Sequence, residues 1–192
     1  MKKEEYADLI KGLSDKELTF HLFLTQIILL TISVILGMIL FNSMAEFVGL
    51  FTWNWQIVSV GGTAGLAVVF LDLFFMKVLP SSFYDDGGLN ERIFKNKSVI
   101  QIAFISAIIA IVEESLFRGV IQTHIGLIIS SLIFAVVHYR YLFNWFLFIN
   151  VVLLSFFIGY IFLLTNNLLV TIFMHFIIDF LLGVTIKIRK KN

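Results

Sequence analysis

Long apolar runs separated by short polar connections are the feature that most restricts how this chain of 192 residues folds. A helix needs roughly 20 mainly apolar residues to cross a bilayer. Hydrophobic residues make up 59% of the chain and charged residues 14%, against about 45–50% and about 25% in soluble domains. Because a water-soluble fold would lack polar surface, we predict a polytopic membrane protein. We place its spans at residues 20–41, 55–79, 99–121, 125–139, 143–165 and 167–186.

The patterning within these runs indicates helices. The runs lack the alternation of apolar and polar residues that a transmembrane barrel requires, and their polar residues recur at helical spacing. We therefore predict an all-α bundle of about six transmembrane helices. The absence of cysteine excludes disulfides, thiolate nucleophiles and cysteine metal sites. A net charge of +1, with most basic residues at the ends and in one loop, leaves no face that could neutralise a run of phosphates and predicts no nucleic-acid partner.

The distribution of lysine and arginine predicts the orientation of the chain. These residues lie in the N-terminal segment, the 80–98 loop, the turn near residue 140 and the C-terminal tail, and the alternate connections have none. By the positive-inside rule, both termini of a multi-pass protein of the cell membrane are then cytoplasmic. We divide the chain into four parts. Residues 1–19 form an interfacial helix or a solvated tail, and residues 20–98 form two leading spans with a cytoplasmic loop. Residues 99–186 form a functional core, and residues 187–192 form a basic tail.

Ionisable residues inside apolar spans are costly, at roughly 2.5–3.5 kcal/mol each, so each needs a reason. In the third span, Glu114 and Arg118 are four residues apart, the favourable order for an ion pair on one helical face. Glu113 is turned about 100° away and lacks that partner. The pattern is consistent with a proton-transferring acid beside a fixed one, or with a structural ion pair and an acid that reaches toward the interface.

Two later spans each carry a histidine on a polar face. Phe134 and His138 share a face at the end of the fourth span, and His175 and Asp179 share a face within the last span. Each pair alone is compatible with a structural role. Because lipid satisfies none of these groups, we expect the three polar faces to meet at one buried site. Such a site has the groups needed to activate water and to stabilise an oxyanion.

At these residues the sequence resembles the CPBP family of intramembrane proteases, which includes the type II CAAX prenyl proteases and bacterial bacteriocin-processing and immunity proteins. The family signatures are Glu-Glu-x-x-x-Arg, Phe-x-x-x-His and His-x-x-x-Asn or Asp, in that order. The resemblance covers roughly residues 99–182 and implies an active site within the bundle. The matching site residues are Glu113, Glu114, Arg118, His138, His175 and Asp179.

The resemblance also implies roles for these residues. Glu113 with His138 would activate the water that attacks the peptide bond, and His175 with Asp179 would stabilise the oxyanion. Glu114 and Arg118 would hold the first carboxylate in place. Asp179 departs from the commoner asparagine, and an aspartate must be protonated to donate to an oxyanion.

Metal dependence is a separate question, because relatives have been described as metalloproteases. The chain lacks the His-Glu-x-x-His pattern of a zincin helix, and the resemblance also supports a metal-free glutamate mechanism. We predict no bound metal and no other cofactor. If zinc is bound, the candidate ligands are Glu113, His138 and His175.

We therefore predict an intramembrane endopeptidase that acts on a membrane-associated protein or peptide, such as a CAAX-type substrate or a bacteriocin or signal peptide precursor. The alternatives are a non-catalytic immunity or regulatory protein on the same fold, and a proton-coupled transporter. One feature fits poorly with a cytosolic substrate. Glu113 lies about 21 Å along its span if the helix begins at residue 99, so either the span begins later or the site lies deep in the membrane.

Overall fold

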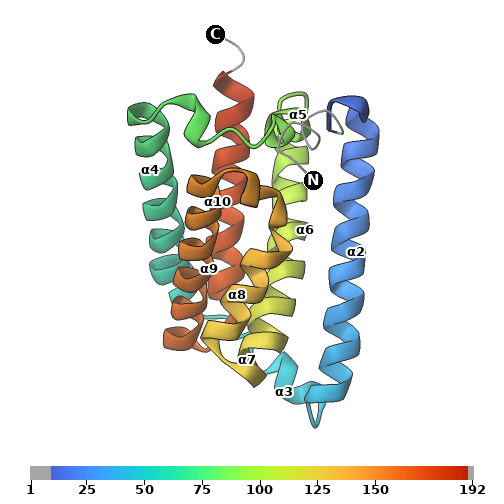
Figure 1. The fold of residues 1–192 in the computed structure, drawn as a ribbon. Coiled ribbons are helices and arrows are strands. Elements are labelled where there is room, and N and C mark those ends of the chain that lie inside the picture. The colour runs from blue at the N-terminus through green and yellow to red at the C-terminus, as the bar shows by residue number, and fades with distance from the viewer. Residues whose placement is uncertain (1–9, 190–192) are drawn as a thin grey trace.

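The computed structural model describes residues 10–189 and is helical, with no strand in that range (Figure 1). Two segments, η1 and η3, are π-helical, and two others, η2 and η4, are 3₁₀-helical. The elements in chain order are α2 (Asp15–Leu40), α3 (Met44–Val48), η1 (Ile57–Gly62), α4 (Thr63–Val78), η2 (Ser81–Phe83), α5 (Leu89–Phe94), α6 (Val99–Glu114), η3 (Ser115–Gln122), α7 (Thr123–Ile125), α8 (Leu127–Val137), η4 (Tyr139–Phe143), α9 (Trp145–Thr165) and α10 (Leu168–Arg189).

The prediction of an all-α membrane bundle is confirmed. Within the described residues, five helical segments are long and apolar enough to cross a bilayer: Asp15–Leu40, Ile57–Val78, Val99–Ile125, Trp145–Thr165 and Leu168–Arg189. The predicted span at 125–139 is shorter than expected, because α8 has 11 residues and extends about 16 Å. The short helix η4 follows α8 and connects it to α9.

Hydrogen-bonded caps fix where two of the helices begin. At α2, the Ser14 hydroxyl accepts a bond from the backbone N–H of Glu17, whose carboxylate accepts the N–H of Ser14 at 2.7 Å. This capping box starts the helix five residues before the predicted apolar span. Ser98 and Gln101 form the same motif and start α6 at Val99, as predicted. Helix α6 therefore begins at the residue where the span was predicted to begin.

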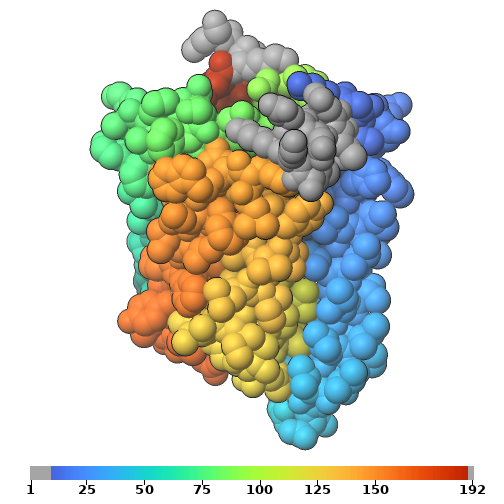
Figure 2. All heavy atoms as spheres, in the orientation of Figure 1, coloured from blue at the N-terminus to red at the C-terminus, as the bar shows by residue number. Residues whose placement is uncertain are grey.

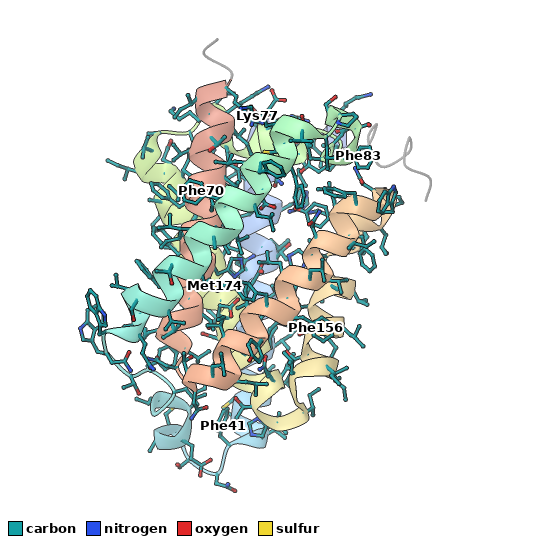
Figure 3. All side chains as sticks on the ribbon, turned by 90° about the vertical axis from the view of Figure 1, so that its left-hand side faces the viewer. Phe41, Phe70, Lys77, Phe83, Phe156 and Met174 are labelled. Atoms are coloured by element: carbon teal, nitrogen blue, oxygen red, sulfur yellow. The ribbon has the colours of Figure 1, made fainter. Side chains whose placement is uncertain are left out.

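Helices α6 and α10 lie inside the bundle. Helix α10 packs against α6, α4 with η1, and α9, while α2 packs against α6 and η3. In the space-filling view, α8 and α9 cover most of α6 and α10 (Figure 2). Figure 3 shows Met174 of α10 behind α4 and α9. A Cβ on Gly65 of α4 would lie 2.9 Å from the Met174 carbonyl oxygen, so a glycine is required for this close approach.

Positive charge gathers at one end of the bundle. The start of α2, helix α5 and the ends of α4 and α10 lie at this end, while α3 and α7 lie at the other (Figure 1). The first end carries Lys77, Arg92, Lys187 and Arg189, whereas residues 41–56 and 119–127 contain no lysine or arginine. This is the asymmetry that the positive-inside rule describes. Residues 1–9 of the N-terminal segment, in which an interfacial helix was predicted, and residues 190–192 of the basic tail lie outside the described residues.

Candidate active site

The structure brings the three polar helix faces together inside the bundle. Helix α6 supplies two glutamates, η3 the arginine, the end of α8 one histidine, and α10 a histidine and an aspartate. Each is linked to another by a hydrogen bond or a close charge contact. The six residues predicted from the sequence thus form one cluster: Glu113, Glu114, Arg118, His138, His175 and Asp179.

Glu114 is the most tightly held of the six. Its Oε1 accepts a bond from Arg118 Nη1 at 3.2 Å and from His175 Nδ1 at 2.8 Å. Its side chain has no exposed surface. The expected ion pair with Arg118 is present, and the same carboxylate also fixes the ring of His175 from a distant part of the chain. Glu114 therefore joins η3 to α10.

Arg118 is enclosed by groups that satisfy its charge. Its Nη2 donates to the carbonyl oxygen of Ser155 at 2.9 Å and to the hydroxyl of the same residue at 3.2 Å. Its guanidinium carbon lies 4.7 Å from the centre of the Phe134 ring, a cation–π contact. Arg118 lies in the π-helical segment η3. Segments of this kind often occur at functional sites.

Glu113 directly precedes Glu114 in the chain but has a different environment. Its Oε1 accepts a bond from the Gln26 amide of α2 at 3.3 Å. Its Oε2 is buried with no hydrogen-bond partner among the described residues, and lies 3.8 Å from His138 Nε2. Glu113 is outside the ion pair that holds Glu114, so one oxygen of a buried carboxylate is available next to a histidine.

The tautomer of His138 follows from its other nitrogen. Nδ1 lies 2.8 Å from the carbonyl oxygen of Phe134. A carbonyl only accepts, so Nδ1 carries the proton and donates it. In the neutral ring, Nε2 is then an acceptor that faces Glu113. Stacking on the Phe134 ring, with centroids 4.3 Å apart, fixes the ring plane. Two acceptors at 3.8 Å can share the protons of one water molecule.

His175 lies between two carboxylates. While Nδ1 is bonded to Glu114, Nε2 lies 3.6 Å from Asp179 Oδ2 on the same helix. The second distance is longer than a normal hydrogen bond. A ring that is protonated on both nitrogens therefore keeps an N–H group that can donate to a developing oxyanion.

The side chains of His138 and Asp179 are more exposed than the rest, at 19% and 27%. Arg140 of η4 is close enough for its charge to act on both. It also acts on Asp86 in the loop between α4 and α6. Burial raises the pKa of the Asp86 carboxyl above its usual value, and the positive charge of Arg140 opposes this. The charge of Arg140 thus lies near the more exposed part of the site and near this loop.

The arrangement does not fit a zinc site. Among residues 10–189, no three histidine, cysteine, aspartate or glutamate side chains are placed to hold a metal ion together. The predicted candidates Glu113, His138 and His175 have other partners, since His175 Nδ1 bonds to Glu114 and Glu113 Oε1 accepts from Gln26.

Two residues in contact with the site were not predicted from the sequence. Gln26 is 6% exposed and bonds to Glu113, and Ser155 of α9 is fully buried and bonds to Arg118. A lone glutamine or serine in an apolar span gives little indication of its partner. The available signal for Gln26 was its position inside a span that is otherwise largely apolar.

Comparison with known proteins gives two matches. Residues 95–181 match the family model described as Rce1-like, type II CAAX prenyl endopeptidase Rce1-like. The protein described as uncharacterized protein YpbD, from Bacillus subtilis (strain 168), is 42% identical over 159 residues, which cover 81% of this chain and 83% of that protein. No solved structure matches the chain. The family match contains the six clustered residues, and Gln26 lies outside it.

Proposed function

The chain belongs to the Rce1-like family of type II CAAX prenyl endopeptidases, and we propose that it is an intramembrane endopeptidase. It hydrolyses a peptide bond in a membrane-associated protein or peptide by means of a water activated by Glu113 and His138. The observation that carries this proposal is the Glu113 Oε2 atom, which is buried, lacks a hydrogen-bond partner among the described residues and faces the acceptor nitrogen of His138.

The proposed reaction begins with a water molecule between Glu113 and His138. Glu113 takes one proton while the water oxygen attacks the carbonyl carbon of the substrate and forms a tetrahedral intermediate. His175 Nε2–H stabilises the negative oxygen, and Asp179 and Glu114 hold that ring in place. The carbon–nitrogen bond then breaks, and the proton on Glu113 passes to the leaving amine. Glu114 and Arg118 position the other groups.

The location of the site favours a substrate that lies in the membrane. Glu113 is about 21 Å from the start of α6, and the bundle around it presents apolar side chains outward. A soluble protein substrate would have to cross much of that depth. We infer a substrate with a lipid anchor or an apolar segment, such as a CAAX-type protein or a bacteriocin or signal peptide precursor, in a cell membrane with both termini of this chain in the cytoplasm.

One observation favours a second candidate, a non-catalytic immunity or regulatory protein that binds a peptide. The contacts among Glu114, Arg118, Ser155 and His175 are fully enclosed and would hold the helices together without any reaction. These contacts do not explain why the unpartnered oxygen of Glu113 faces the acceptor nitrogen of His138. Pure binding does not require that group.

The test is an inventory of peptide termini in membranes and medium from cells that carry the intact protein or the Glu113→Gln variant at equal abundance. Glutamine has the shape of glutamate and still accepts a bond from Gln26, but it does not act as a base. We expect a set of terminal peptides to be lost with Glu113→Gln, and we call these the Glu113-dependent peptides. Identical inventories with an unchanged cellular phenotype would contradict the proposal and favour the binding protein.

A further inference from the structure

We infer that Gln26 is a positioning residue for the reaction, so that helix α2, which lies outside the family match, completes the active site. The inference rests on the proposed function. Gln26 orients the Glu113 carboxylate through its amide N–H.

The first support is the burial of Gln26. Most apolar side chains of helix α2 are exposed. Only 17% of its membrane-spanning part is buried inside the bundle. Its buried residues are Leu18, Gln26, Leu29 and Ser33, which recur at helical spacing and form one face. Gln26 is therefore on the face that packs against α6 and η3. Burying an amide in this environment is costly unless it is hydrogen-bonded.

The second support is the direction of its hydrogen bond. Gln26 Nε2 lies 3.3 Å from Glu113 Oε1, and the two residues are 87 positions apart in the chain. An ionised carboxylate only accepts, so the amide nitrogen has to face it. Because Oε1 is occupied in this way, Oε2 is the oxygen that faces His138 at 3.8 Å. Gln26 thus decides which oxygen of Glu113 is available for proton transfer.

The third support is a pair of buried acceptors. Gln26 Oε1 and Glu113 Oε2 both lack a hydrogen-bond partner among the described residues. They belong to two side chains that bond to each other, so they lie in the same small region. The protons of the reacting water go to Glu113 Oε2 and His138 Nε2, so Gln26 Oε1 is a further acceptor beside the carboxylate and can bind a neighbouring donor.

The test compares the effects of two substitutions on peptide release. The order of these two effects distinguishes a positioning role from a packing role. Gln26→Met conserves length and volume but removes the donor and the acceptor. Gln26→Asn keeps the amide on a shorter side chain and leaves space. A positioning role predicts that release of the Glu113-dependent peptides falls about 10- to 100-fold with Gln26→Met and less with Gln26→Asn. A packing role predicts the opposite order.

A matched control comes from the same helix face. Leu29→Met also places methionine at a buried position of α2, without contact to the carboxylate, and we expect wild-type release. Release with Gln26→Met equal to that of Leu29→Met would overturn the inference. If Gln26→Met does not accumulate in membranes, Gln26→Leu takes its place with the same expected order. The Glu113→Gln variant is compared with the intact protein before the Gln26 variants are tested. If Glu113→Gln removes no peptides, this result contradicts the proposed function itself and not only the role of Gln26.

Discussion

The two adjacent glutamates of α6 lie in two different halves of the site. The half around Glu114, with Arg118, His175 and Ser155, has hydrogen bonds of 2.8–3.2 Å, and the charged side chains of Glu114 and Arg118 are at most 1% exposed. The half around Glu113, with His138, has separations of 3.3–3.8 Å. Oε2 of each glutamate is buried without a hydrogen-bond partner among the described residues, and that of Glu113 faces His138 Nε2. We call them the closed half and the open half.

The difference shows how a membrane bundle can combine stability with reactivity. A buried charge without a partner is strongly destabilising, so the closed half must be complete for the fold to persist. A group that transfers protons needs an unbonded atom close to a second proton acceptor, and in the open half Glu113 Oε2 lies 3.8 Å from His138 Nε2. If this division is correct, substitutions in the closed half mainly affect folding, and those in the open half mainly affect the reaction.

The largest effect is expected for Arg118→Leu in the closed half. The substitution leaves the Glu114 carboxylate buried without its cation, at a cost of about 3–5 kcal/mol. We expect the thermal unfolding midpoint in detergent to fall by about 10 °C and the protein to accumulate poorly in membranes. Arg189→Leu, at the exposed end of α10, is the matched control and is expected to behave as the wild type.

Removing both charges tests this explanation. A double variant with Arg118→Leu and Glu114→Leu no longer has an unpaired charge, so it should recover part of the lost midpoint. A double variant less stable than Arg118→Leu alone would show that the ion pair is not the reason for the loss.

The next effect concerns the open half. His138→Gln removes the acceptor nitrogen that faces Glu113, and we expect release of the Glu113-dependent peptides to fall about 10²- to 10⁴-fold. The unfolding midpoint should stay within about 2 °C, because the hydrogen bond that the ring makes among the described residues goes to a carbonyl of its own helix. Both quantities are measured on the same membrane preparation. A large loss of midpoint with retained cleavage would reverse the assignment of His138.

The smallest effect is expected for Ser155→Ala. Arg118 loses the bond to the Ser155 hydroxyl but keeps the bond to the carbonyl oxygen of the same residue. We expect a loss of about 1 kcal/mol, seen as a midpoint about 2–4 °C lower, with cleavage close to that of the wild type. No change in midpoint would mean that the closed half tolerates the loss of a partner and is less tightly coupled than its distances indicate.

Much of the fold follows from the sequence because one property dominates it. Apolar segments of the required length must become helices in a bilayer, and each of the six predicted segments contains a helix. The ends depend on local chemistry, and the capping box at Ser14 extends α2 beyond its apolar run. The π-helical form of η3, all of whose residues are buried, gave no signal in the sequence.

The candidate site was predictable only in part, for a similar reason. Ionisable residues in apolar spans are easily recognised in the sequence. Because an ionisable group is costly to place in the bilayer, such residues are expected to contact one another. Their pairing is not visible in the sequence: His175 bonds to Glu114 across 61 positions, and Gln26 bonds to Glu113 across 87. The sequence alone does not indicate that the uncharged amide of Gln26, in a largely lipid-facing helix, contacts a carboxylate; the fold shows this contact.

The most direct test of the two halves compares Glu113→Gln with Glu114→Gln, the same substitution at neighbouring residues. Unfolding midpoint and release of the peptides found with the intact protein are measured for both. We predict that Glu113→Gln stays within about 2 °C of the wild-type midpoint and releases none of them, whereas Glu114→Gln lowers the midpoint by about 10 °C because Arg118 is left without its anion. The opposite pattern, with Glu113→Gln unstable but active and Glu114→Gln stable, would contradict the account.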